Sequence, residues 1–213
     1  MKTLLQSFFG KLSISLILVL AAQSLSAQVT YTDSVCAGST DVVYGVTGAA
    51  ATSHYSWFLN DPTAGTIDST VSANNGTIEI DWGVVAGTYT LYVVESDQYG
   101  CYSDTNSLNI VINPLPTVAI QADSVCEGFS ASLTFTLTGT APWIIDYTDG
   151  STNFTDTANA TPYVVSLPNY NTSQTVTVTG LTDANGCAAD PSGLPNTPVI
   201  IHPKPSTGAI YHY

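Results

Sequence analysis

Basic residues are almost missing from this sequence. Its 213 residues include three lysines, no arginine and sixteen acidic residues. Two of the lysines, Lys2 and Lys11, precede residue 28, so the rest of the chain has a single lysine, Lys204. Proteins need clustered cations to displace counterions from nucleic-acid phosphates and to bind anionic lipids. The composition therefore excludes nucleic-acid binding and argues against docking on an acidic membrane surface.

Charged residues of either sign are also scarce, at 9% of the chain, whereas hydrophobic residues make up 44%. An apolar fraction of this size argues against disorder. Thr, Ser, Gly, Asn, Val and Tyr are abundant, and this mixture favours strands joined by turns over long helices.

Residues 1–27 have the pattern of a secretory signal peptide. A cationic start is followed by an apolar run at 12–22 and by a small-residue exit, Ser24-Leu25-Ser26-Ala27. The run is about half the length that a membrane-spanning helix needs. No cysteine lies at or just after the expected cleavage point, which argues against a lipoprotein anchor. We therefore expect an extracytoplasmic protein in an oxidising compartment.

Three short motifs occur twice, in the same order and at similar spacing. They are Asp33–Gly38 with Asp123–Gly128, Asp97–Cys101 with Asp183–Cys187, and Ile112–Thr117 with Ile201–Ser206. Ordered repetition of this kind indicates a tandem duplication of one small domain. The Pro-x-Pro segment at the end of each copy cannot continue a strand ladder. We predict domains at 28–114 and 115–205, followed by a short aromatic tail at 206–213.

The four cysteines allow three pairings. Because a unit that is copied whole should carry its own bridge, the duplication predicts Cys36–Cys101 and Cys126–Cys187, each at one end of its domain. The chain-entropy model gives about 4 kcal/mol of stabilisation for each such loop. A zinc site would need closely spaced cysteine pairs, which this sequence lacks.

Short runs rich in Val, Ile, Tyr and Thr alternate with turn residues along both copies. They lie at 41–47, 53–59, 76–82, 88–94 and 107–112, and at 131–137, 143–147, 162–167, 175–181 and 197–201. Several alternate apolar and polar residues, as half-buried strands do. We predict an all-β protein of two tandem β-sandwiches, with Trp57, Trp82 and Trp143 in their cores.

The motifs resemble a known repeat family. The first copy has Tyr55-Ser56-Trp57, then 76–83, 86–90 and Tyr99-Gly100-Cys101, and the second has 138–143, 147–150 and 182–187. This order is similar to that of the PKD-like, immunoglobulin-like repeats of bacteria with type IX secretion and gliding motility. The resemblance implies a spacer, an adhesin stalk or an assembly part. No sorting domain of the family follows Pro205, which favours the periplasm, with the cell surface or secretion as alternatives.

Two further kinds of site are expected. The tail residues Ile210, Tyr211, His212 and Tyr213 are a candidate docking peptide that adds as a strand to a partner, and a frayed terminus is the alternative. Ser34, Ser69, Ser124 and Thr157 each follow an aspartate and precede an apolar residue or, for Ser69, Thr70. They resemble O-glycosylation sites of the same bacteria, although Asp-Ser pairs are also common in turns.

Catalytic motifs are not found in this sequence. His54 has no nucleophile motif beside it, and the pairs Glu79/Asp81 and Asp146/Asp149 are better explained as solvated strand and turn residues. No cofactor is expected. Acidic turns at 146–153 and 183–185 make structural calcium the ligand to consider, although no twelve-residue calcium loop is present.

These observations predict a non-enzymatic secreted protein that acts through protein–protein contacts as a cell-envelope accessory. A carbohydrate-binding or adhesin-type surface module is the alternative, and it requires at least one solvent-exposed tryptophan. A hydrolase is the third hypothesis, and it requires a cleft that contains His54 and a nucleophile.

Overall fold

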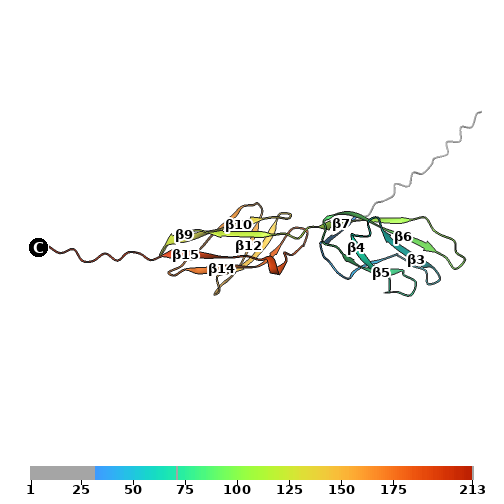
Figure 1. The fold of residues 1–213 in the computed structure, drawn as a ribbon, viewed down its shortest axis with the longest axis horizontal. Helices are drawn as coiled ribbons and strands as arrows, with labels where there is room; N and C mark the ends of the chain where they lie inside the picture. Colours follow the sequence, from blue (N-terminus) through green and yellow to red (C-terminus); the bar gives the residue numbers. More distant parts are fainter. Residues whose placement is uncertain (1–31, 71, 213) are drawn as a thin grey trace, which may run out of the picture.

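The computed structural model describes residues 32–70 and 72–212. The predicted signal peptide lies outside these residues. Every regular element among the described residues is a strand, apart from one turn of 3-10 helix at Pro191–Gly193, and no helix there is long and apolar enough to cross a membrane. The strands form two β-sandwiches placed end to end (Figure 1). The predicted all-β class is confirmed.

The first sandwich, module 1, is built from two facing sheets. Its strands are β1 (Thr32–Cys36), β2 (Val42–Gly45), β3 (His54–Leu59), β4 (Gly65–Asp68), β5 (Thr77–Trp82), β6 (Gly87–Ser96) and β7 (Asn106–Asn113). One sheet has the order β1-β7-β6-β3 and the other β2-β5-β4. β1 runs parallel to β7, whereas the other neighbouring strands are antiparallel. Facing, mainly antiparallel sheets of this kind form an immunoglobulin-like sandwich.

The core of module 1 follows from the two-residue period of its strands. In β5, Ile78, Ile80 and Trp82 are buried, while the residues between them face outward. From the other sheet, Ile110 and Ile112 of β7 meet them in one cluster. Alternation along each strand therefore buries one face of each sheet.

The second sandwich, module 2, has a similar plan. Its strands are β8 (Val118–Ala122), β9 (Ser124–Cys126), β10 (Ser130–Leu137), β11 (Trp143–Thr148), β12 (Asn153–Ala158), β13 (Tyr163–Asn169), β14 (Gln174–Thr182) and β15 (Asn196–His202). The sheets have the orders β13-β10-β8 and β12-β11-β14-β15-β9. The chain changes sheet at Asp123, because β8 pairs with β10 whereas β9 runs parallel to β15.

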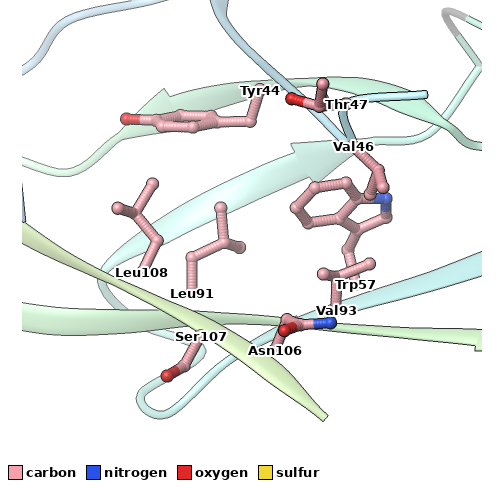
Figure 2. A pocket seen from close by; sticks show the side chains of 10 residues that line it. Tyr44, Val46, Thr47, Trp57, Leu91, Val93, Asn106, Ser107 and Leu108 are labelled. Carbon is pink, nitrogen blue, oxygen red and sulfur yellow. The ribbon is translucent and has the colours of Figure 1, made fainter. Parts of the chain in front are cut away.

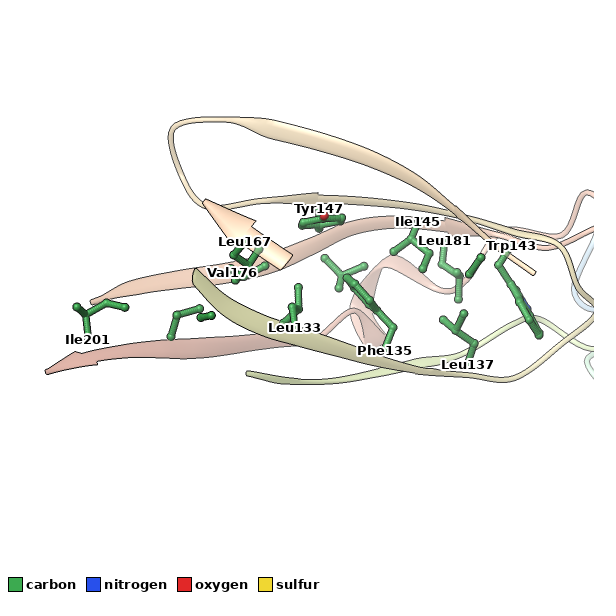
Figure 3. Close-up of a cluster of buried hydrophobic side chains, with 14 residues drawn as sticks. Leu133, Phe135, Leu137, Trp143, Ile145, Tyr147, Leu167, Val176, Leu181 and Ile201 are labelled. Atoms are coloured by element: carbon green, nitrogen blue, oxygen red, sulfur yellow. The ribbon is translucent and has the colours of Figure 1, made fainter. Parts of the chain in front are cut away.

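A continuous apolar cluster fills module 2 (Figure 3). Phe135 lies near its centre, fully buried, with its ring 5.3 Å from that of Tyr147. The Tyr147 hydroxyl donates to Asp156 Oδ2 at 2.7 Å, so the polar end of this buried ring has a partner. Trp143 closes the cluster at the end that faces module 1.

All ten predicted runs contain strands of the structure, but some strands were not predicted. β4 has only four residues. β12 has the sequence Asn-Phe-Thr-Asp-Thr-Ala, in which Asp156 occupies an inward position. A polar residue on the inner face breaks the apolar alternation that signals a strand. The short 3-10 turn was also not anticipated.

Candidate functional site

The place where the two modules meet holds a disulfide bond. Cys36 is bonded to Cys187, 151 positions later in the chain, with their Cα atoms 5.5 Å apart. Cys36 ends the first strand of module 1, and Cys187 lies in the loop between β14 and β15 of module 2. The bond therefore links the modules to each other, and we call this region the joint.

On the module 1 side, the joint begins with a tight turn at 36–39, the cysteine turn. The Ala37 amide donates to the carbonyl of Asn113 at 2.8 Å, which continues the parallel ladder of β1 and β7 by one bond. The Ser39 amide then donates to the Cys36 carbonyl at 3.1 Å. Gly38 has φ +77°, a conformation that L side chains rarely adopt. This turn presents Cys36 at the end of the sandwich.

On the module 2 side, a hairpin at 183–187 presents the second cysteine. The Asp183 carboxylate Oδ1 accepts hydrogen bonds from the amides of Asn185 at 2.9 Å and Cys187 at 3.1 Å. Its Oδ2 accepts from the Thr140 amide at 3.1 Å. Asp183 is 5% exposed and Cys187 is fully buried. A buried carboxylate thus fixes the position of the sulfur.

The linker is attached to both modules. Leu115 packs against the core of module 1, whereas Pro116 is buried against Gly139 of module 2. A Cβ atom at Gly139 would lie 3.0 Å from the Pro116 Cβ, so this approach requires a glycine. The disulfide adds a second covalent connection to this linker, and the two connections together restrict the relative motion of the modules.

The predicted pairings Cys36–Cys101 and Cys126–Cys187 are wrong. Cys36 pairs in register with Asn113 at the end of β7, whereas Cys101 precedes the start of the same strand at Asn106. Eight residues of strand span about 25 Å, far more than the 4.5 Å or so between Cβ atoms in a disulfide. The two cysteines of each module therefore lie at opposite ends of its sandwich.

Module 2 repeats this separation. Cys126 pairs with His202 at the end of β15, and Cys187 comes before that strand begins at Asn196. Each module therefore contributes one cysteine to the joint and holds the other at its opposite end.

Cys101 and Cys126 are free and exposed. They occupy the two outer ends of the molecule: Cys101 in the β6–β7 hairpin and Cys126 at the end of β9, beside the start of the tail (Figure 1). Exposed aromatic rings accompany them. Tyr99 and Tyr102 are 82% and 76% exposed next to Cys101, and Phe129, near Cys126, is 62% exposed.

A cavity of about 360 Å³ opens between the sheets of module 1 (Figure 2). Tyr44, Trp57, Leu91 and Leu108 provide most of its apolar wall. The Tyr44 hydroxyl donates to Asp33 Oδ2 at 3.2 Å, and burial raises the pKa of this hydroxyl above its ordinary value. No acid and base face each other in the lining, so the cavity offers a binding volume without a catalytic pair.

Tryptophan positions bear on the carbohydrate alternative. Trp82 and Trp143 are buried, and Trp57 is half-buried with its Nε1 donating to the Asn75 carbonyl at 2.7 Å. The predicted core positions of the three tryptophans are confirmed. The exposed tryptophan that a sugar-stacking module requires is not among them.

The acidic residues considered for chemistry accept hydrogen bonds that support strand pairs and turns. Asp146 Oδ1 accepts from the Thr155 hydroxyl at 2.6 Å. Asp149 Oδ1 accepts from the amides of Ser151 and Thr152, and the Thr152 bond is the main cause that lowers the pKa of this carboxyl below its ordinary value. Within residues 32–70 and 72–212, no three His, Cys, Asp or Glu side chains are grouped as metal ligands.

The remaining predicted residues are accessible. Ser34, Ser69, Ser124 and Thr157 are all exposed, as glycosylation would need, and their modification stays a prediction. His54 is exposed on β3, at the edge of its sheet. In the tail, Ile210, Tyr211 and His212 are exposed outside any strand, and Tyr213 lies outside the described residues.

No protein-family model matches this chain, and no curated protein matches it. Among solved structures, it is similar to the fibronectin(III)-like modules of Clostridium thermocellum CbhA, with 16% identity, 88% of this chain and 98% of that chain covered, and a TM-score of 0.40. The D00-D0 domain of Intimin has 14% identity, with 82% and 97% covered and a TM-score of 0.40.

An eight-domain fragment of Down Syndrome Cell Adhesion Molecule has 17% identity and a TM-score of 0.46, with 82% of this chain and 23% of that chain covered. These similarities are weak. The description as two tandem immunoglobulin-like sandwiches therefore depends on the strand order and the two cores given above.

Proposed function

We propose that this protein is a non-catalytic structural component of a bacterial cell envelope, a stiff two-module spacer that contacts protein partners through its ends. The observation that carries this proposal is the joint, where a disulfide and a doubly anchored linker hold the modules together. A chain whose modules only needed to be tethered would not require this second connection.

The same bond supports a location outside the cytoplasm. Structural disulfides form and persist in oxidising compartments outside the cytoplasm. We place the protein in the periplasm, delivered by the signal peptide proposed at residues 1–27. The resemblance of its repeats favours an assembly of type IX secretion or gliding motility as the setting.

The ends are the best candidates for contact surfaces. Large exposed aromatic side chains gather there, with Tyr99 and Tyr102 at one end and Phe129 at the other. Aromatic residues are enriched where proteins bind one another. A spacer that works through its ends needs no reactive centre, in keeping with the turn-bracing roles of its carboxylates.

Stiffness is tested by measuring the distance between the ends. Nitroxide labels on the exposed thiols of Cys101 and Cys126 report this distance by double electron–electron resonance. We expect a narrow distribution in the wild-type chain and a clearly broader one when Cys36 and Cys187 are both replaced by serine. Equal widths in the two proteins would remove the basis for a stiff spacer.

Contact through the ends is tested in intact cells with a photoreactive amino acid. We would place it at Tyr99 or Phe129, and at Ile144 as the control, because Ile144 is an exposed apolar residue on the side of module 2. We expect protein adducts from the two ends and few from the side. Adducts from Ile144 alone would contradict end-on contacts.

A further inference from the structure

The exposed cysteines occupy the same structural positions as the bonded ones. Ninety positions separate Cys36 from Cys126 in the repeated motif Asp-Ser-Val-Cys. Cys101 likewise corresponds to Cys187, since each ends an Asp-x-x-Gly-Cys motif. The correspondence extends to the backbone geometry at both outer ends.

Cys126 lies in a second copy of the cysteine turn. The Glu127 amide donates to the His202 carbonyl at 2.8 Å, and the Phe129 amide donates to the Cys126 carbonyl at 3.1 Å. Gly128 has φ +86°. Each of these features matches the turn at Cys36. The outer end of module 2 therefore presents the sulfur of Cys126 in the way that module 1 presents the sulfur of Cys36 at the joint.

Cys101 lies in a second copy of the cysteine hairpin. Asp97 Oδ1 accepts from the amides of Tyr99 and Cys101, both at 2.8 Å. The Asp97 amide donates to the Cys101 carbonyl at 3.0 Å, as the Asp183 amide does to the Cys187 carbonyl. The outer end of module 1 thus repeats the hairpin hydrogen bonds that present Cys187 at the joint.

From this equivalence we propose that copies of this protein join head to tail through a disulfide between Cys126 of one copy and Cys101 of the next. The contact repeats the joint inside the chain, so the modules continue at the same spacing through the assembly. A contact between two different surfaces leaves each added copy with a free end. Because the modules of one chain lie end to end (Figure 1), repetition of the same contact extends the row into an open filament. The partner in this contact is a second copy of this chain. The proposed spacer function does not depend on such self-association.

The hairpin end is the more acidic of the two, and both ends carry exposed apolar surface. The Cys126 end has one cation, Lys204, whose Nζ lies 6.0 Å from the centre of the Phe129 ring, and one carboxylate, Glu127, whose Oε2 accepts from the Lys204 amide at 3.4 Å. The hairpin end carries Glu95, Asp97 and Asp104. Docking would bring this lysine toward an acidic end. It would also cover Phe129, Tyr99 and Tyr102, which are otherwise exposed to solvent.

The bond requires an oxidant, and we assign that role to a disulfide-carrying thiol oxidant, either a small molecule or an oxidoreductase. A thiolate attacks the oxidant disulfide to form a mixed disulfide, and the second thiolate then displaces the reduced sulfur. Two S–H bonds are lost and one S–S bond forms between the copies. The two electrons and two protons reduce the oxidant disulfide to two thiols.

Serine variants of the full exported chain test the proposal in a glutathione redox buffer. Wild-type protein should give a ladder of dimers, trimers and larger species on non-reducing gels. Cys101→Ser alone and Cys126→Ser alone should each give about a tenth of the dimer that their mixture gives, because each lacks one partner of the bond and can form only the disfavoured symmetric pair. A mixture of the two variants should give dimers and stop there, since each copy then supplies a single reactive end.

Peptide mapping identifies the bond that forms. We expect Cys101–Cys126 peptides in about tenfold excess over the symmetric pairs, a ratio that a modest docking preference produces and that should fall to the statistical value in denaturant. Circular dichroism and an intact Cys36–Cys187 peptide serve as folding controls for each variant. Dimers from either single variant in the yield that the mixture gives, or glutathione adducts with no ladder in the wild type, would refute the head-to-tail bond.

Discussion

Removing the joint disulfide should destabilise one module far more than the other. In the wild type, the bond limits the entropy of whichever module unfolds first. The double variant Cys36→Ser/Cys187→Ser lacks this limit, so its first unfolding step becomes more favourable. When module 1 is unfolded on a folded module 2, the bond closes a loop from Cys36 to Pro116. The chain-entropy model gives about 4.5 kcal/mol for such a loop of about 80 residues.

The second unfolding step gains much less from the bond. Once both modules are unfolded, the closed loop grows to the full span of 151 positions. Each doubling of loop length changes the closure entropy by only about 0.6 kcal/mol. The variant should therefore lose about 4.5 kcal/mol in its first transition and about 0.6 kcal/mol in its second. A loss of the first size is comparable with the whole stability of a small domain.

The tryptophans allow the two steps to be read separately. Trp57 and Trp82 report on module 1, and Trp143 reports on module 2. Urea unfolding would be followed by fluorescence in the wild type, with Trp143→Phe to isolate module 1. The matched control is Cys101→Ser/Cys126→Ser, which removes two exposed thiols and should leave both midpoints in place. Equal losses in both transitions, or none in either, would refute the loop-closure reasoning.

Three further predictions concern single residues. Phe135→Ala should cost module 2 about 4 kcal/mol, because it opens a cavity in the centre of that core, and the Trp143 signal should shift while that of module 1 does not. Asp183→Ala should lower the free energy of unfolding by about 3 kcal/mol and expose Cys187 to reduction, since buried amides lose a charged acceptor. Asp97→Ala, in the exposed hairpin, should lower it by only about 1 kcal/mol. Similar losses in the two variants would show that burial of the carboxylate is unimportant. Asp149 has a folded-state pKa below its unfolded value, so the stability it contributes is present above about pH 4 and is lost as the pH falls through the folded pKa. In Asp149→Asn, the urea midpoint should therefore decrease less on acidification than in the wild type. An unchanged pH profile would contradict the assignment.

Much of the fold could be predicted from local sequence. Alternation of apolar and polar residues, as in Thr77–Trp82, fixes which face of a strand is buried, and turn residues fix where strands end. The repeated motifs correctly indicated two similar domains. β12 escaped prediction because Asp156 lies inward, where its partner is the hydroxyl of Tyr147, and only the tertiary structure supplies that partner.

The cysteine partners depended on tertiary structure alone. Duplication shows that Cys36 and Cys126 occupy equivalent positions, but it does not say whether a bond forms inside a unit or between adjacent units. That choice was made by strand direction, because β1 runs parallel to β7 and so carries Cys36 to the end of the sandwich opposite Cys101. A disulfide forms only between sulfurs that the fold brings together, and strand pairing between distant parts of a chain is not written in its local pattern.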